Sequence, residues 1–173
     1  FEERIAPRFY RDSAIVTLSN SSRDELVSEM GFDPDRVSVV PPGVDQHFSP
    51  GGERTPEPTV LAVGRLVPVK DVPRLVRLMA QVRERVPTAR LRIVGDGYER
   101  ERINSLIGDL DAHDYISLLG RVDDDELLDF YRSSWTVAST SIREGWGMTV
   151  TEGAACGTPC VATRIAGHSD AAI

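Results

Sequence analysis

Two glutamates separated by seven residues, Glu144 and Glu152, are the side chains in this sequence best suited to chemistry. The first lies in a predicted loop after a strand, and the second lies about one to two turns into the predicted helix that follows. Gly145 and Gly147 leave backbone N–H groups accessible at the start of this helix, where the helix dipole favours an anion. Carboxylates accept hydrogen bonds from sugar or ribose hydroxyls. The pattern predicts that the two acids bracket a ligand whose negative group lies at the helix N-terminus.

The alternative is that both glutamates are ordinary surface acids, one in a solvated loop and one on an exposed helix face. The neighbours of Glu152 argue against this alternative. Gly153, Ala154 and Ala155 are small and favour close packing of the helix on a sheet. An acid in such a helix needs a partner, because burying an unpaired charge is costly.

A pair of cations follows another predicted strand. Gly64 and Arg65 come directly after the apolar run 59–63, and Lys70 stands five residues beyond Arg65. Arginine binds phosphate through two hydrogen bonds and lysine acts as a point charge, so the pair is suited to a diphosphate. The alternative is a solvated basic pair beside Asp71, and the residues alone leave both interpretations open.

Two other motifs have simpler structural interpretations. Gly95-Asp96-Gly97 begins like a dinucleotide-binding fingerprint, but Arg100 stands where the third glycine is needed, so we expect a tight turn. Cys156 and Cys160 have no further ligands nearby and are interpreted as small buried thiols rather than a metal site.

Three further features of the sequence are less informative about function. Asp123 to Asp125 open a predicted helix and are interpreted as its cap, with Glu126 completing the capping box. His168 follows the last predicted strand and could face the pocket. Trp146, between two glycines, is either a pocket wall or a core residue.

The elements that must position these residues alternate between strand and helix. After residue 58, apolar runs predict five strands with helices between them, at 59–63, 91–94, 116–119, 135–139 and 159–163. The helix predicted at 72–86 places Val72, Leu75, Val76, Met79, Val82 and Val86 on one face. This order implies an α/β fold with a Rossmann-like, doubly wound parallel sheet. Ligands bind such sheets at the carboxyl ends of the strands, near the switch point.

The first part of the chain predicts only the end of another α/β domain. A short helix, a strand at 14–18, a helix at 22–30 and a strand at 36–40 are expected, with Ser22 and Glu25 forming a capping box. Two strands are too few for a complete parallel sheet. The stretch FSPGGERTPEP at 48–58 is typical of an exposed linker. The predicted domains are therefore 1–48, a linker at 49–58, and 59–173.

Composition excludes several classes of protein. The 173 residues carry 27 acidic and 20 basic side chains, a net charge of −7, which argues against nucleic acid as the main partner. Two cysteines are too few for a disulfide scaffold and fit a reducing compartment. No apolar run is long enough to span a membrane. The chain begins with Phe1 rather than Met, so we expect a fragment, in which missing targeting signals carry no weight.

The motifs, taken together and in order, resemble the retaining glycosyltransferases of family 4. The run from Glu144 to Pro159 resembles the E-(seven residues)-E signature of that family, and Val63 to Leu66 with Lys70 resembles its phosphate-contacting stretch. Ile93 to Gly97 and Pro42 to Asp45 also match in order and spacing. The resemblance covers nearly the whole chain.

This resemblance implies a GT-B fold, with two Rossmann-like domains facing across a cleft. Residues from about 57 onward resemble the donor-binding C-terminal domain, and residues 1–48 resemble the last elements of the acceptor-binding N-terminal domain. The chain would lack that domain's acceptor site and catalytic-centre histidine, and would end before the last strand and closing helices.

The family's site residues carry over position by position. Arg65 and Lys70 would hold the donor diphosphate, Glu152 the ribose and Glu144 the sugar, so Arg65, Lys70 and Glu144 are the expected catalytic residues. Backbone groups from Gly145 to Met148 would contact the sugar and phosphate, and the turn Gly120-Arg121-Val122 would meet the base. The complete predicted donor site is Gly64, Arg65, Lys70, Gly120, Arg121, Val122, Glu144, Gly145, Trp146, Gly147, Met148, Thr149 and Glu152.

The implied reaction transfers a sugar from a nucleotide-diphosphate sugar with retention of anomeric configuration. No cofactor and no metal are expected, and the nucleotide sugar is the substrate. The acceptor, a glycan, lipid or small molecule, would bind through the missing domain, so the chain alone is expected to be inactive. The resemblance implies a cytoplasmic location and allows peripheral association of the full-length protein with the inner face of the membrane.

Two alternatives to a transferase stay open. One is a GT-B sugar-nucleotide epimerase, and the other is a non-catalytic nucleotide-sugar-binding or protein-binding module. A flavodoxin-like receiver domain is disfavoured, because no acidic cluster with a phosphoacceptor aspartate stands at a strand end.

Overall fold

The chain forms two compact units in the computed structural model, which describes residues 7–10 and 12–172. The small unit comprises Phe1–Gly43, Glu144–Gly147 and Arg164–Ile173, and the large unit comprises Val44–Arg143 and Met148–Thr163. The domain boundaries expected at 48 and 58 stay a prediction.

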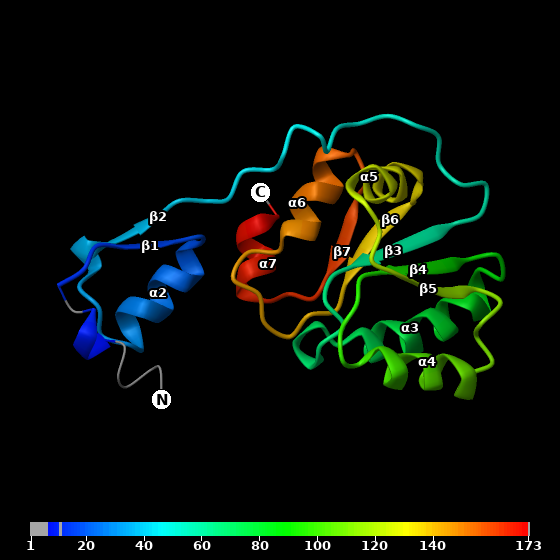
Figure 1. The fold of residues 1–173 in the computed structure, drawn as a ribbon, viewed down its shortest axis with the longest axis horizontal. Coiled ribbons are helices and arrows are strands. Elements are labelled where there is room, and N and C mark those ends of the chain that lie inside the picture. The colour runs from blue at the N-terminus through cyan, green and yellow to red at the C-terminus, as the bar shows by residue number, and fades with distance from the viewer. Residues whose placement is uncertain (1–6, 11, 173) are drawn as a thin grey trace. The chain divides into compact units, whose positions relative to one another are not determined.

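The large unit is built on a five-stranded parallel sheet (Figure 1). Its strands are β3 (Thr59–Val63), β4 (Arg90–Val94), β5 (Ile116–Gly120), β6 (Thr136–Ser139) and β7 (Cys160–Ala162), in the order β5-β4-β3-β6-β7. The predicted α/β fold with a parallel sheet is therefore confirmed. The chain builds outward from β3 through β4 to β5, and β6 then adds to the other side of β3. The topological switch point lies between β3 and β6.

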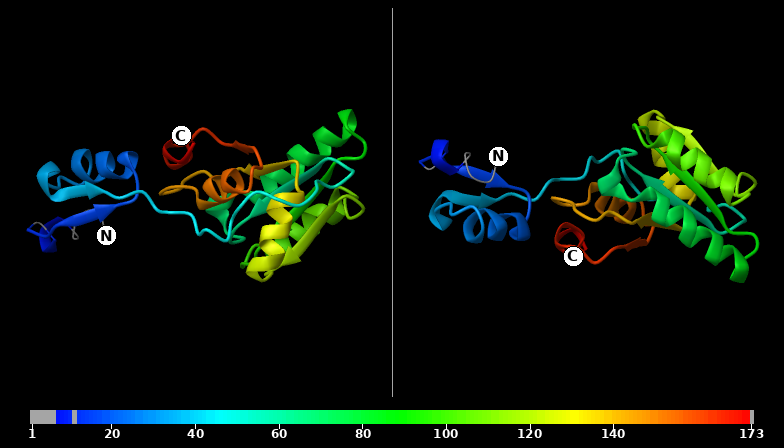
Figure 2. Two further views of the ribbon diagram at one scale, coloured as in Figure 1. Left: turned by 90° about the horizontal axis from the view of Figure 1, so that it is seen from above. Right: turned by 90° about the horizontal axis from the view of Figure 1, so that it is seen from below.

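Helices cover both faces of this sheet (Figure 2). On one face, α3 (Val72–Arg85) and α4 (Arg100–Asp109) pack with alternate strand residues such as Ala62 and Ile93. On the other face, α5 (Asp124–Ser133) and α6 (Met148–Ala155) lie over the intervening residues, including Leu61 and Val94. Strand side chains point alternately to the two faces, so a strand that is apolar at every position serves both cores.

The apolar face of α3 is buried over only part of its predicted length. Val72, Leu75, Val76 and Met79 of the predicted face are buried, whereas Val82 and Val86 are 40% and 38% exposed. The exposed end of the stripe borders a hollow whose other wall comes from β6 and β7. β7 is one of the two edge strands of the sheet, and its Val161 is 67% exposed.

The small unit contains a two-stranded parallel sheet and short helices. Its elements are β1 (Ile15–Thr17), α2 (Asn20–Ser28), the single 3₁₀ turn η1 (Pro34–Arg36), β2 (Val37–Val39) and α7 (Ala166–Ala171). The short helix predicted before β1 falls partly outside the described residues, and residues 7–9 are helical. α7 was not predicted, because its six residues are too few to show a helical repeat.

The predicted cap of α2 is wrong by three residues. Ser19 is the N-cap, in an extended conformation, and its hydroxyl accepts a hydrogen bond from the Ser22 N–H. Three serines lie close together here, and the fold buries Ser19 completely. The Asp170 carboxylate of α7 also accepts hydrogen bonds from the backbone and side chain of Ser21, at the first turn of α2.

The stretch predicted as a linker lies within the large unit, where side chains distant in sequence hold it. Arg132 Nε donates to the Ser49 carbonyl at 2.8 Å, and Trp135 Nε1 donates to the Thr55 carbonyl at the same distance. Arg54 donates to the carbonyls of Ser134 and Gly157. These hydrogen bonds hold the Pro- and Gly-rich stretch in place.

Candidate functional site

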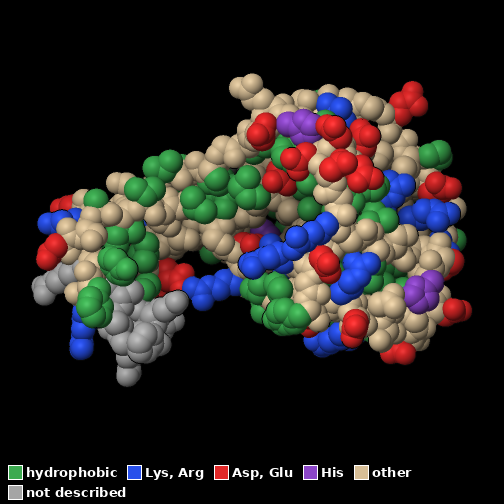
Figure 3. Space-filling model, viewed as in Figure 1, with side chains coloured by type: hydrophobic (Ala, Val, Ile, Leu, Met, Phe, Trp, Pro, Cys, Tyr) green, Lys and Arg blue, Asp and Glu red, His purple; other side chains and the backbone are tan. Residues whose placement is uncertain are grey.

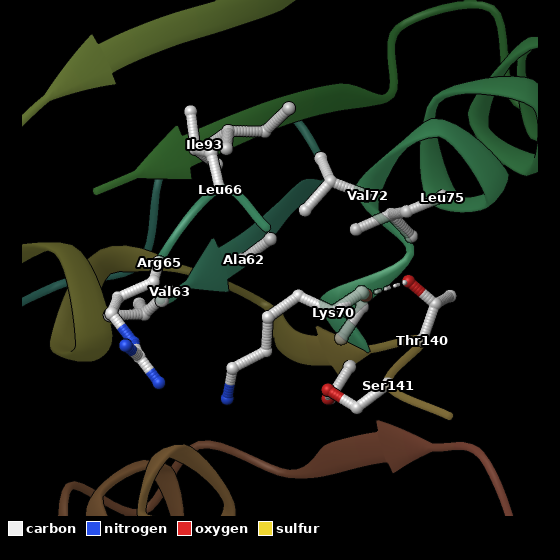
Figure 4. Close-up of a pocket in the computed structure, with 13 residues that line it drawn as sticks. Ala62, Val63, Arg65, Leu66, Lys70, Val72, Leu75, Ile93, Thr140 and Ser141 are labelled. Atoms are coloured by element: carbon white, nitrogen blue, oxygen red, sulfur yellow. Dashed lines mark hydrogen bonds between the residues drawn. The ribbon is translucent and has the colours of Figure 1, made fainter. Parts of the chain in front are cut away.

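A hollow lies at the switch point, between the carboxyl ends of β3 and β6. Its mouth carries two cations, Arg65 and Lys70, and no acidic residue lines it. Figure 4 shows both side chains extending to the same side of the β3 turn. The lining residues are Ala62, Val63, Gly64, Arg65, Leu66, Lys70, Val72, Leu75, Ile93, Ala138, Ser139, Thr140 and Ser141. This arrangement suits an anionic ligand, and it brings the predicted cations together where an open α/β sheet binds ligands.

Gly64 allows the Lys70 side chain to cross the end of β3. A Cβ built on Gly64 would lie 3.5 Å from Lys70 Cε and 3.8 Å from its Nζ. The lysine stem therefore lies against the backbone of the strand end. Arg65 is exposed, whereas Lys70 is half-buried, so the lysine position is the more constrained of the two.

The turn that carries Lys70 is held by a residue that the sequence did not single out. Lys70 ends the 3₁₀ turn η2 (Pro68–Lys70), and Asp71 follows with φ of 46°. Thr140, from the loop after β6, donates to the Asp71 carbonyl at 2.9 Å and to the Lys70 carbonyl at 3.2 Å (Figure 4). The Ile142 N–H donates to the Val69 carbonyl at 2.9 Å. The only signal for Thr140 in the sequence is its place after a predicted strand.

The turns after β3, β4 and β5 are joined backbone to backbone. The Leu66 N–H donates to the Asp96 carbonyl at 2.9 Å, and the Gly95 N–H donates to the Gly120 carbonyl at 2.7 Å. A Cβ on Gly95 would lie 1.9 Å from the Gly64 carbonyl oxygen, and Gly95 has φ of 127°. The prediction that Gly95-Asp96-Gly97 forms a tight turn is confirmed, and the turn sets the position of Gly64 and Arg65.

The turn Gly120-Arg121-Val122 follows β5 on the same edge of the sheet. Arg100 of α4 lies beneath it and donates through Nη2 to the Leu118 carbonyl at 3.3 Å. A Cβ on Gly120 would lie 3.5 Å from Arg100 Nη1, which is buried and has no hydrogen-bond partner among the described residues. The structure therefore places this turn beside the buried Nη1 of Arg100, and the contact of the turn with a base stays a prediction.

Glu152 has the partner that its small neighbours led us to expect. It is half-buried in α6, and the hydroxyl of Tyr131 in α5 donates to its Oε2 at 2.6 Å. A Cβ on Gly153 would lie 2.9 Å from Cys160 Sγ and from Val137 Cγ2, so α6 packs closely on the sheet. Met148 and Thr149 form the first turn of the same helix.

Glu144, Gly145, Trp146 and Gly147 belong to the small unit. A Cβ on Gly167 would lie 2.2 Å from the Glu144 carbonyl oxygen, so α7 packs on the backbone at Glu144. Trp146 is 7% exposed, and its indole Nε1 is buried with no hydrogen-bond partner in the described part of the chain. His168 is 3% exposed and lies beside Gly147. The bracketing of one ligand by Glu144 and Glu152 stays a prediction.

The remaining polar groups show no cluster suited to a metal. Asp123 caps α5 and forms the predicted capping box with Glu126. Figure 3 shows acidic side chains gathered around a histidine over the start of α5, where Asp45, His47 and Asp123 to Asp125 line a hollow. Among residues 7–10 and 12–172, no group of three or more histidine, cysteine or acidic side chains could hold a metal ion.

The two cysteines are free thiols in the large unit. Cys156 is buried and Cys160 is half-buried. Burial raises the pKa of the Cys160 thiol to about 11 and shifts the pKa of Cys156 in the same direction. Both residues are therefore protonated near neutral pH, in agreement with their interpretation as packing residues.

None of the described helices has the length and apolar character needed to cross a membrane.

The fold matches solved structures of GT-B glycosyltransferases. A structure of Anabaena HepE in complex with UDP and glucose aligns with a TM-score of 0.84 at 22% identity, over 96% of this chain and 49% of that chain. WaaG, a glycosyltransferase involved in lipopolysaccharide biosynthesis, aligns with a TM-score of 0.79 at 15% identity, over 92% of this chain and 46% of that chain. At these identities the match shows the fold alone.

Residues 44–173 match the family model described as Glycosyl transferases group 1, and the chain belongs to this family. It is 36% identical to a D-inositol 3-phosphate glycosyltransferase of Acidothermus cellulolyticus, over 91% of this chain and 39% of the relative. It is 34% identical to the enzyme of the same name from Pseudarthrobacter chlorophenolicus, over 92% of this chain and 42% of the relative. The chain thus spans about two fifths of the length of these relatives.

Proposed function

We propose that this chain is the donor-binding part of a retaining glycosyltransferase of family 4. In this proposal the whole enzyme transfers a sugar from a nucleotide-diphosphate sugar to an acceptor bound by another part of the protein. The observation that carries the proposal is the pair Arg65 and Lys70 at the mouth of the switch-point hollow, inside the region that matches the glycosyltransferase family. The proposed donor is a uridine diphosphate sugar, since HepE structures are described with UDP and with UDP-glucose.

Arg65 and Lys70 act on the leaving group in this proposal. As the bond between the anomeric carbon and the diphosphate breaks, negative charge builds on the diphosphate oxygens. Two fixed cations stabilise that developing charge more than they stabilise the ground state, and this difference lowers the barrier. Thr140 holds the backbone of the η2 turn that carries the lysine. No metal or other cofactor is proposed for this step.

In this proposal the two glutamates bind hydroxyl groups of the donor. Glu152 accepts hydrogen bonds from the ribose, and Glu144 from the sugar. The backbone from Gly145 to Met148 contacts the sugar and phosphate, and the turn Gly120 to Val122 contacts the base. Retention follows if the acceptor attacks the face from which the diphosphate leaves, through an oxocarbenium-like transition state.

The two glutamates should affect different ligands. Glu152→Ala should weaken binding of UDP and of UDP-glucose alike, because both contain the ribose. Glu144→Ala should weaken mainly UDP-glucose, because UDP has no sugar for it to contact. Loss of a hydrogen bond to a charged acceptor costs about 1.5–3 kcal/mol. Titration calorimetry of both variants with both ligands measures the difference, and equal losses for both ligands in both variants would refute the division of roles.

Transfer itself should require more than residues 1–173. The residues assigned here all serve the donor, whereas transfer needs the acceptor hydroxyl held close to the anomeric carbon and needs water excluded. We expect no product from the chain alone, and transfer with retention by the full-length enzyme without added divalent metal. NMR of the product determines the anomeric configuration, with and without a chelator.

Three outcomes would contradict parts of this proposal. Transfer by residues 1–173 alone would contradict the division of labour between donor and acceptor parts. Loss of full-length activity with a chelator would contradict the metal-free mechanism. Release of an epimerised sugar nucleotide, with no transfer to an acceptor, would favour the epimerase alternative.

A further inference from the structure

A buried tyrosine contacts the carboxylate assigned to the ribose. Tyr131 is fully buried in α5, and its hydroxyl donates to Glu152 Oε2 at 2.6 Å. The two residues are 21 positions apart and lie on different helices. Tyr131 lies outside the E-(seven residues)-E run.

The Tyr131 ring is held on several sides, so its hydroxyl has one position. The ring belongs to the core with Leu61, Leu128 and Val137. Phe48 packs against it edge to face, with ring centroids 5.6 Å apart. The Tyr131 backbone carbonyl also accepts a hydrogen bond of 2.7 Å from the buried Thr158 hydroxyl. Moving the hydroxyl would require moving part of the core.

Glu152 is held at its backbone and at one carboxylate oxygen. The backbone is fixed because Gly153 packs on Val137 and Cys160 with no room for a Cβ. The Tyr131 hydroxyl occupies Oε2, and within the described part of the chain Oε1 accepts no hydrogen bond. A free glutamate side chain has several rotamers, and binding must select one of them at an entropic cost. The tyrosine reduces that cost by selecting the rotamer in advance.

The Tyr131 hydroxyl remains a donor at all physiological pH values. Burial raises the pKa of the phenol far above its ordinary value, and the negative charge of Glu152 raises it further. A protonated phenol can donate a hydrogen bond to the carboxylate oxygen that faces it, as the Tyr131 hydroxyl does to Glu152 Oε2. The contact therefore keeps Glu152 as an oriented acceptor for hydroxyl groups.

We propose that Tyr131 is a positioning residue that orients Glu152 toward the ribose hydroxyls of the nucleotide. This inference rests on the proposed function, because it takes the ribose as the ligand of Glu152. It adds a specificity role: the Tyr131–Glu152 pair sets the preference of the protein for a ribonucleotide over a nucleotide that lacks the ribose hydroxyls.

The test compares UDP with 2′,3′-dideoxy-UDP in wild type and Tyr131→Phe. Wild type should bind UDP more tightly than the dideoxy compound. Tyr131→Phe removes one oxygen atom and keeps the ring, so it should weaken UDP binding about five- to tenfold. It should leave the affinity for dideoxy-UDP unchanged, because that ligand gives Glu152 nothing to orient toward. Titration calorimetry supplies the four affinities, and circular dichroism checks that the variant is folded.

Two further variants separate positioning from a general structural effect. Tyr115→Phe is the matched control, since it deletes the same atom from a partly buried ring that packs on Arg83. Tyr115→Phe should change neither the affinity for UDP nor the affinity for dideoxy-UDP. In a Glu152→Ala background, Tyr131→Phe should cause no further loss of UDP binding, because the group that it orients is absent.

The possible results distinguish this inference from the proposed function. Equal weakening of UDP and dideoxy-UDP by Tyr131→Phe, or no weakening of either, overturns the positioning role while leaving the UDP site in place. Wild type that binds UDP without discriminating against dideoxy-UDP overturns the ribose assignment of Glu152, and the positioning role with it. Wild type that binds neither compound overturns the proposed donor as well.

Discussion

The Arg65→Ala/Lys70→Ala variant is expected to lose UDP binding while remaining folded. The two cations supply the positive charge at the mouth of the switch-point hollow, and no acid lines it. Each hydrogen bond between charged partners contributes about 1.5–3 kcal/mol, so the pair together should be worth at least about 100-fold in affinity. Titration calorimetry measures the loss. Thermal unfolding should be nearly unchanged, since Arg65 is exposed and Lys70 is half-buried.

A matched control is available on the adjacent helix. Arg74 and Arg77 of α3 are exposed and lie outside the hollow. Arg74→Ala/Arg77→Ala removes the same net charge and should change UDP affinity by less than about threefold. If the Arg65/Lys70 variant bound UDP as tightly as wild type, the diphosphate site would have to lie elsewhere. If both double variants lost affinity equally, the effect would reflect overall charge and not a site.

Gly95→Ala should be among the most destabilising single substitutions in the chain. The new Cβ would lie 1.9 Å from the Gly64 carbonyl oxygen, and the backbone at Gly95 has φ of 127°, where alanine is strained. Neither group can move freely, because the turns after β3, β4 and β5 are hydrogen-bonded to one another. We expect a loss of about 3–5 kcal/mol in the free energy of unfolding. Urea denaturation followed by circular dichroism measures it.

Gly43→Ala is the control for this substitution. A Cβ at Gly43 would meet no atom within 4 Å, and its φ does not lie in the left-handed range. Gly43→Ala should therefore change the free energy of unfolding by no more than about 1 kcal/mol. A Gly95→Ala variant as stable as Gly43→Ala would show that the turn can relax, and the close contact with Gly64 would then not set the position of Arg65.

The sequence predicted the sheet and the cations at its edge because these features depend on local patterns. The apolar runs predicted the ends of the five strands of the large unit to within one residue. A glycine and an arginine at the end of β3 must lie at the carboxyl edge of any parallel sheet. The capping box at Asp123 was also predicted correctly, because a cap involves residues only three positions apart. The cap of α2 was predicted wrongly, because several neighbouring serines could each cap the helix. Ser19 is the one that caps it, and its side chain is fully buried in the fold.

The sequence by itself determined the alternation of strands and helices and the residue types available to bind a nucleotide sugar. Only the tertiary structure decided which other residues hold these binding residues in place. Thr140 fixes the Lys70 turn from a loop 70 residues away, and Tyr131 reaches Glu152 from the next helix packed on the same face. Such contacts depend on the strand order β5-β4-β3-β6-β7, which brings β6 beside β3. Strand order follows from packing over the whole domain, and no periodicity or short motif encodes it.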